Sequence, residues 1–124
     1  MKKLLSVIVL LIIFTTGLSA QTTYTLPTAT VAGKSGGVIS KDTLINAGKL
    51  ECSDPGFVIK SFTLTIEVPP DLVSITSKTP EFTEIMKGYL AGAKAGQKIF
   101  FEDIKATNAE GKTYNLAVMS FKLQ

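Results

Sequence analysis

The stretch from Phe57 to Val68 constrains the fold more than any other part of the chain, because apolar and polar residues alternate along it. One set of alternate positions holds Val58, Phe62, Leu64, Ile66 and Val68, and the other holds Ser61, Thr63, Thr65 and Glu67. A repeat of two residues is typical of a strand with one face on the core and one in water. We expect Pro69 and Pro70 to end this strand.

Shorter strands are expected on both sides of this long one. They are predicted over residues 28–32, 49–52, 72–77, 97–106, 112–116 and 118–123. Turn residues separate several of them, at 53–56 and at 108–111. The adjacent Phe100 and Phe101 cannot share one face of a regular strand. Either both faces are covered there or a β-bulge lies close by.

One segment departs from the strand pattern and predicts a helix over about 81–93. Its apolar residues fall on a single helical stripe, which we interpret as a buried face rather than a docking surface. They are Phe82, Ile85, Met86, Tyr89 and Leu90. Thr79 is predicted to cap this helix with Pro80 just inside it. The sequence therefore predicts a mainly β, single β-sandwich-like domain with one helix (about 81–93) packed on the sheet.

A shorter helical turn is expected ahead of the long strand. Ser40 is predicted to cap a segment from Lys41 to Ala47 that buries Leu44. Gly48 is predicted to end it, because glycine readily adopts the left-handed conformation that closes a helix.

Residues 1–20 have the layout of a secretory signal peptide: Lys2 and Lys3, an apolar run from 4 to 14, and the small residue Ala20. Cleavage is expected between Ala20 and Gln21, which would send the protein to the periplasm or outside the cell. The apolar run is too short for a retained spanning helix, so no stable membrane insertion is predicted after cleavage. Residues 21–27 are predicted to be a flexible lead-in and 28–124 the folded domain.

The charge pattern argues against nucleic-acid binding. Two of the 13 basic residues lie in the predicted signal, and the others nearly balance the 10 acidic residues. The sequence contains no arginine, whose planar guanidinium group binds phosphates through two N–H donors at once. Its lysines are scattered and form no basic stripe.

The residues present favour a protein that is not an enzyme. With no histidine in the sequence, Ser-His-Asp and Cys-His arrangements cannot be built. Cys52 is the only cysteine, so an internal disulfide is impossible and a structural zinc site lacks ligands. We expect Cys52 to be buried as a small apolar residue rather than exposed as a reactive thiol.

Carboxylates are the remaining candidates for catalysis, and four of them have informative positions. Glu102 and Asp103 are neighbours on a predicted strand and would point to opposite faces. Asp54 and Asp71 lie in predicted turns, where acidic residues commonly bond to the backbone. A hydrolase using two carboxylates would need them about 5–9.5 Å apart in a cleft. No catalytic, cofactor-binding or metal-binding residue is predicted.

Three blocks of sequence resemble the C-terminal domain of GldM, a gliding-motility protein of Bacteroidota. They are Thr30 to Gly48, Ile59 to Ile66, and the closing part with GQKIFFEDIKA at 96–106, Gly111-Lys112 and Ser120 to Leu123. The resemblance covers about residues 28–123. It implies a β-rich, sandwich-like module at the periplasmic tip of a protein that couples a motor to type IX secretion and gliding, with no known catalytic residues. Residues 114–118 depart from the family pattern, so contacts made there are not carried over.

We therefore expect a free-standing, non-catalytic, exported protein–protein interaction domain of the cell envelope, with an envelope protein as its partner. A monomer is expected, because the resemblance implies that family dimers are held largely by other regions. The alternative is a secreted small-ligand or glycan-binding module, for which Tyr24, Tyr89 and Tyr114 are the amphipathic aromatic residues. A concave pocket would favour the alternative, and an apolar patch or open strand edge, first sought at 28–32, would favour a protein partner.

Overall fold

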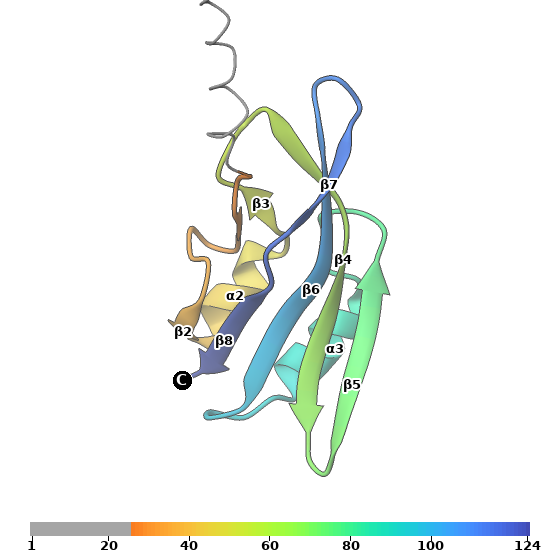
Figure 1. The fold of residues 1–124 in the computed structure, drawn as a ribbon. Helices are drawn as coiled ribbons and strands as arrows, with labels where there is room; N and C mark the ends of the chain where they lie inside the picture. The colour runs from red at the N-terminus through yellow and green to blue at the C-terminus, as the bar shows by residue number, and fades with distance from the viewer. Residues whose placement is uncertain (1–25) are drawn as a thin grey trace, which may run out of the picture.

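The computed structural model describes residues 26–124, which form two layers (Figure 1). One layer is a six-stranded sheet in the order β2-β8-β6-β4-β5, with β7 also paired to β6. Its strands are β2 (Gly37–Ile39), β4 (Phe57–Val68), β5 (Asp71–Ser77), β6 (Lys98–Asn108), β7 (Thr113–Leu116) and β8 (Met119–Leu123). The predicted signal peptide, its cleavage site and most of the lead-in lie outside the described residues.

The second layer is mixed. It contains the helices α2 (Lys41–Ala47) and α3 (Glu84–Ala91), which lie against one face of the sheet in Figure 1. It also contains a two-stranded antiparallel sheet of β1 (Ala29–Thr30) and β3 (Glu51–Cys52). The prediction of a mainly β single domain is confirmed. In place of the sandwich-like arrangement with one helix, two helices and a two-stranded sheet cover the six-stranded sheet. Among residues 26–124, no helix is long and apolar enough to cross a membrane.

The core lies between the layers and is centred on four phenylalanine rings, all of them buried: Phe62, Phe82, Phe101 and Phe121. The Phe101 ring lies 5.8 Å from those of Phe62 and Phe82, and 6.1 Å from that of Phe121, measured between ring centroids. Aromatic pairs at such separations add to the stabilisation that comes from burying their area. The rings thereby join β4, β6 and β8 to the segment that precedes α3.

Strand β4 has the predicted bounds, but its alternation is interrupted by a bulge. Ile59 pairs with Ala106 and Ser61 pairs with Lys105, so β4 advances two residues while β6 advances one. The extra residue, Lys60, changes which side chains face inward. Ile59 is therefore buried, whereas Val58 is 54% exposed. The prediction that Val58 faces the core is wrong for this reason.

A second bulge lies in β6 and compensates for the first. Between the pairs Ser61–Lys105 and Thr63–Glu102, β6 advances three residues while β4 advances two. Asp103 lies within this bulge and has a φ angle of 50°. Phe101 is buried on the inner face, and Phe100 is half-buried on the opposite face. Of the two alternatives for the adjacent phenylalanines, a bulge close by is present, and Phe100 on the outer face is also partly covered.

Helix α2 is capped as the sequence predicts. The backbone N–H of Thr43 donates to the Ser40 hydroxyl at 3.1 Å, and Gly48 closes the helix with a φ angle of 69°. Leu44, within this helix, is fully buried. The cap residues are local signals, so the sequence alone places this helix correctly.

The N-cap of helix α3 lies four residues after the predicted cap at Thr79. Thr83 is its N-cap, and the Thr83 hydroxyl accepts a hydrogen bond from the backbone N–H of Met86 at 3.1 Å. One local and one long-range hydrogen bond hold the preceding residues outside the helix. The buried Ser77 hydroxyl donates to the carbonyl of Glu81 at 2.7 Å, and the N–H of Phe82 donates to the carbonyl of Gly48 at 2.9 Å.

Loss of the Thr83 hydroxyl should therefore destabilise the protein. We expect Thr83→Ala to lower the free energy of unfolding by about 1 kcal/mol, because an N-terminal N–H of α3 loses its acceptor. Thr83→Ser keeps the hydroxyl and should unfold close to the wild type. Urea unfolding followed by circular dichroism measures both, and an alanine variant with the wild-type midpoint would show that the cap is unimportant.

Candidate interaction surface

Strand β5 leaves one edge of the six-stranded sheet open. It pairs with β4 in unbroken register, from Phe62 opposite Ser77 to Val68 opposite Asp71. Among the described residues, no strand pairs with its other side. Natural edge strands are commonly protected by proline, lysine, bulges or short length. Within the seven residues of β5, only the charged Asp71 at its start is a protective feature, and the remaining edge is of the kind that strand addition uses.

The opposite edge of the sheet is protected. Strand β2 has only three residues, and the Lys34 ammonium donates to the backbone carbonyl of Val38 at 3.0 Å. The edge first sought at 28–32 is also a poor site. Only Ala29 and Thr30 form β1 there, and the side chains of Ala29 and Val31 are fully buried. An open edge is therefore found at β5 and not at the predicted segment, and the four-residue β7, which pairs only with β6 among the described strands, is a shorter one.

Helix α3 exposes part of its apolar stripe. Met86 and Leu90 are fully buried, but Ile85 is 62% exposed and Tyr89 is 40% exposed. Each exposed residue precedes a buried one and is turned from it by about 100° around the helix axis. Ile85, Gly88 and Tyr89 line a shallow, mainly apolar depression of about 200 Å³. The prediction that Ile85 and Tyr89 belong to the buried face is therefore wrong.

The exposed flank of α3 is turned away from α2. On the opposite flank, Lys87 is half-buried. At the end of the helix, the Lys41 ammonium of α2 donates to the carbonyls of Ala91 and Ala93, at 2.9 and 3.1 Å. In Figure 1, α2 lies toward β8 and α3 lies toward β4 and β5. Helix α3 thus lies behind the part of the sheet that includes the edge strand β5.

We call this region the β5–α3 surface. It consists of the free backbone edge of β5, the half-buried side chains of Val73 and Ile75, and the exposed flank with Ile85, Gly88 and Tyr89. Backbone groups are available for hydrogen bonding along its strand, and apolar side chains lie on its inner side. This combination is the one that strand addition uses.

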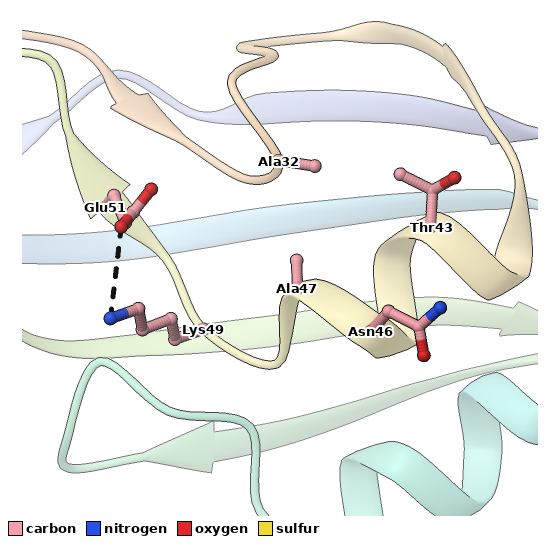
Figure 2. A pocket seen from close by; sticks show the side chains of 6 residues that line it. All are labelled: Ala32, Thr43, Asn46, Ala47, Lys49 and Glu51. Atoms are coloured by element: carbon pink, nitrogen blue, oxygen red, sulfur yellow. Dashed lines mark ion pairs between the residues drawn. The ribbon is translucent and has the colours of Figure 1, made fainter.

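A depression lined by both polar and apolar side chains, called here the polar depression for its Lys49–Glu51 pair, lies on another part of the molecule (Figure 2). Its volume is about 410 Å³, and it is lined by Ala32, Thr43, Asn46, Ala47, Lys49 and Glu51. The Lys49 ammonium lies 3.9 Å from the Glu51 carboxylate, and both side chains are more than half exposed. An exposed pair of this kind is weak. No aromatic side chain is among the six lining residues, whereas small-molecule sites are mostly lined by apolar and aromatic groups.

The tyrosines considered for glycan binding do not meet in this depression. Tyr24 lies outside the described residues, and Tyr89 belongs to the β5–α3 surface. Tyr114 packs against Phe57, with 5.8 Å between ring centroids. The aromatic residues that the sequence offered for sugar stacking are thus not brought together.

The four candidate carboxylates also lie in separate local environments. Asp54 accepts the backbone N–H of Gly56 at 2.8 Å, which confirms its role in a turn. Glu102 accepts the hydroxyl of Thr65 at 2.8 Å. Asp103 lies 2.8 Å from the ammonium of Lys105. Asp71 begins β5 at the open edge.

Cys52 and the acidic residues provide no metal site within residues 26–124. In that range, no group of three or more cysteine, aspartate or glutamate side chains is placed to hold a metal ion. Cys52 is a free cysteine that packs against the core but is only half-buried. The expected burial of Cys52 is therefore incomplete.

One known protein family matches the whole of the described structure. The family model for the GldM C-terminal domain matches residues 26–124. The match includes both layers of the fold and the β5–α3 surface. No curated protein matches the chain.

Proposed function

The chain belongs to the GldM C-terminal domain family, and from this we propose that it is a non-catalytic protein–protein interaction domain of the cell envelope. In this proposal it works with the gliding-motility and type IX secretion machinery, after export through its N-terminal segment. The observation that carries the proposal is the β5–α3 surface, which combines an unprotected strand edge with exposed apolar side chains.

The proposed mechanism is addition of a strand to β5. An incoming extended segment forms main-chain hydrogen bonds with the free edge, and these supply affinity. Its inward side chains then contact Val73 and Ile75 of β5 together with Tyr89 of α3. Such contacts select a partner segment by the size and polarity of alternate residues. No bond is made or broken in this process.

The polar depression of Figure 2 gives the alternative function less support. Lys49 and Glu51 face solvent there, and a polar ligand would replace hydration without burying much apolar area. An open strand edge beside apolar side chains favours a protein partner instead.

Site-specific photo-cross-linking in the producing cells tests the proposal. A benzophenone amino acid placed at Tyr89 should form a discrete adduct with a protein. The same group at Val118, which is 56% exposed outside the surface, is the matched control and should form none. A Lys49→Ala/Glu51→Ala double variant should leave the Tyr89 adduct unchanged. The absence of any adduct at Tyr89, or identical adducts at both positions, would contradict the proposed function.

A further inference from the structure

We propose that the face of the sheet opposite the helices carries a second interaction surface, which binds an acidic segment of a partner protein. We call it the β6–β8 lysine face, and it consists of Lys98 and Lys122 together with Val38, Phe100 and Ser120. Because it lies on the other side of the sheet from α3, this inference goes beyond the proposed function and does not depend on the β5–α3 surface.

Strand pairing brings the two lysines together. The register of β6 with β8 places Lys98 directly opposite Lys122. The next pair, Ile99 and Phe121, is buried in the core, so the lysine side chains extend from the opposite, outer face. Both lysines are exposed. They lie far apart in the sequence, and only the fold makes them neighbours.

The positive charges of this pair are not neutralised within residues 26–124. There, neither ammonium group takes part in a salt bridge or a hydrogen bond. Glu67 of the neighbouring strand β4 instead uses its carboxylate to accept the backbone N–H of Lys98 at 3.2 Å. Like charges directly opposite each other on one face of a sheet are destabilising. A local rule broken in this way is expected where function requires it.

Protection of a sheet edge does not explain the two lysines. Lysine on an edge strand prevents unwanted pairing, but β6 and β8 are inner strands in the order β2-β8-β6-β4-β5. The edge strand β2 has its own lysine, since the Lys34 ammonium donates to the carbonyl of Val38 at 3.0 Å. Lys34 thus adds a third positive charge at the border of the lysine face.

The charge and the apolar groups of this face select its occupant. Its three ammonium groups are complementary to carboxylates, which favours a ligand of opposite charge. Val38 lies opposite Lys122 and is 48% exposed, and Phe100 lies opposite Ser120 and is half-buried. Apolar groups beside the charges favour a polypeptide, which carries both kinds of side chain, over a polymer that offers charge alone. In an extended segment, alternate carboxylates face the same way about 7 Å apart, and the flexible lysine stems can meet this spacing.

Nuclear magnetic resonance titration of the isotope-labelled protein tests the inference. The probe is a short, capped peptide of alternating aspartate and valine, and the same peptide with asparagine in place of aspartate is the control. We expect the aspartate peptide to shift the amide signals of Lys98 and Lys122, and the control peptide to leave them unchanged. Added salt should weaken the binding, because exposed charges are screened. Tighter binding of polygalacturonate or of phosphatidylglycerol vesicles would identify a carbohydrate or a membrane as the occupant and would overturn the inference.

Charge reversal at Lys122 separates binding from folding. We expect Lys122→Glu to raise the dissociation constant of the aspartate peptide at least about tenfold, because an attraction becomes a repulsion. The same change turns a like-charge pair into an opposite-charge pair with Lys98, so the thermal midpoint should not fall. Lys78→Glu is the matched control: it reverses the charge of an exposed lysine directly after β5, and it should bind like the wild type.

Three binding results would overturn the inference: no shift with the aspartate peptide, equal binding of the control peptide, or equal losses in Lys122→Glu and Lys78→Glu. A lower thermal midpoint in Lys122→Glu would show that the lysine pair is not under repulsion, and it would overturn the inference as well. None of these results would remove the proposed function, because the Tyr89 adduct reports on a different surface.

Discussion

Replacement of Phe101 by alanine is expected to lower the free energy of unfolding by about 3–5 kcal/mol. The Phe101 side chain is fully buried and lies within about 6 Å of three other phenylalanine rings. Its removal leaves a cavity where β4, β6 and β8 meet the segment before α3. A domain of this kind has a total stability of about 5–15 kcal/mol, so the variant should be close to unfolding at moderate temperature. Urea titration followed by circular dichroism measures the loss.

Phe100 provides a control of the same residue type at the neighbouring position. Its side chain is half-buried on the opposite face of β6, opposite Thr65 of β4. Phe100→Ala should therefore cost less than half as much as Phe101→Ala, because less apolar area is lost and water can fill the space. Equal losses in the two variants would show that the faces of β6 are assigned wrongly.

Replacement of Leu90 by alanine is expected to cost about 2–5 kcal/mol. Leu90 is fully buried on the side of α3 that packs on the sheet. Alanine keeps the helix propensity, so the loss reports packing between α3 and the sheet rather than helix formation. Chemical denaturation of the wild type and the variant at one temperature measures the difference.

Tyr89 is the matched control for Leu90, one residue away on the same helix. It is 40% exposed, and Tyr89→Ala should cost less than about 1 kcal/mol, as is usual for surface substitutions. A loss similar to that of Leu90→Ala would mean that Tyr89 belongs to the core. It would thereby remove the apolar flank from the β5–α3 surface.

Local signals were enough to predict several elements from the sequence. The alternation ended by Pro69 and Pro70 gives the bounds of β4, and Ser40 and Gly48 give those of α2. In each case the residues that determine the structure lie inside or next to the element. The family resemblance over 28–123 is confirmed by the match over 26–124.

Features that depend on distant partners could not be predicted in this way. The bulge at Lys60 arises from the pairing of β4 with β6, which no local pattern of β4 reveals. Thr79 and Pro80 are good local signals for a helix start. They are overridden because hydrogen bonds from Ser77 to Glu81 and from Phe82 to Gly48 keep these residues out of the helix until Thr83.

The candidate surface was missed for the same physical reason. Whether a strand lies at the edge of a sheet depends on the order of the strands. That order cannot be deduced from the sequence of β5 alone. Ile85 and Tyr89 fit the apolar stripe of α3, but the sheet covers only the narrower face carrying Met86 and Leu90. The signal that was available is the absence of proline and lysine from β5, which marks an unprotected edge once its position is known.

Hydrogen–deuterium exchange of the β5 amides tests the central claim most directly, because strand addition must protect the amides that point away from β4. Exchange is compared between the free protein and the protein in complex with the partner that cross-links at Tyr89. We predict slower exchange across Asp71–Ser77 in the associated protein and unchanged exchange at Gly37–Ile39 of the other edge. Association that leaves exchange in β5 unchanged would contradict the account.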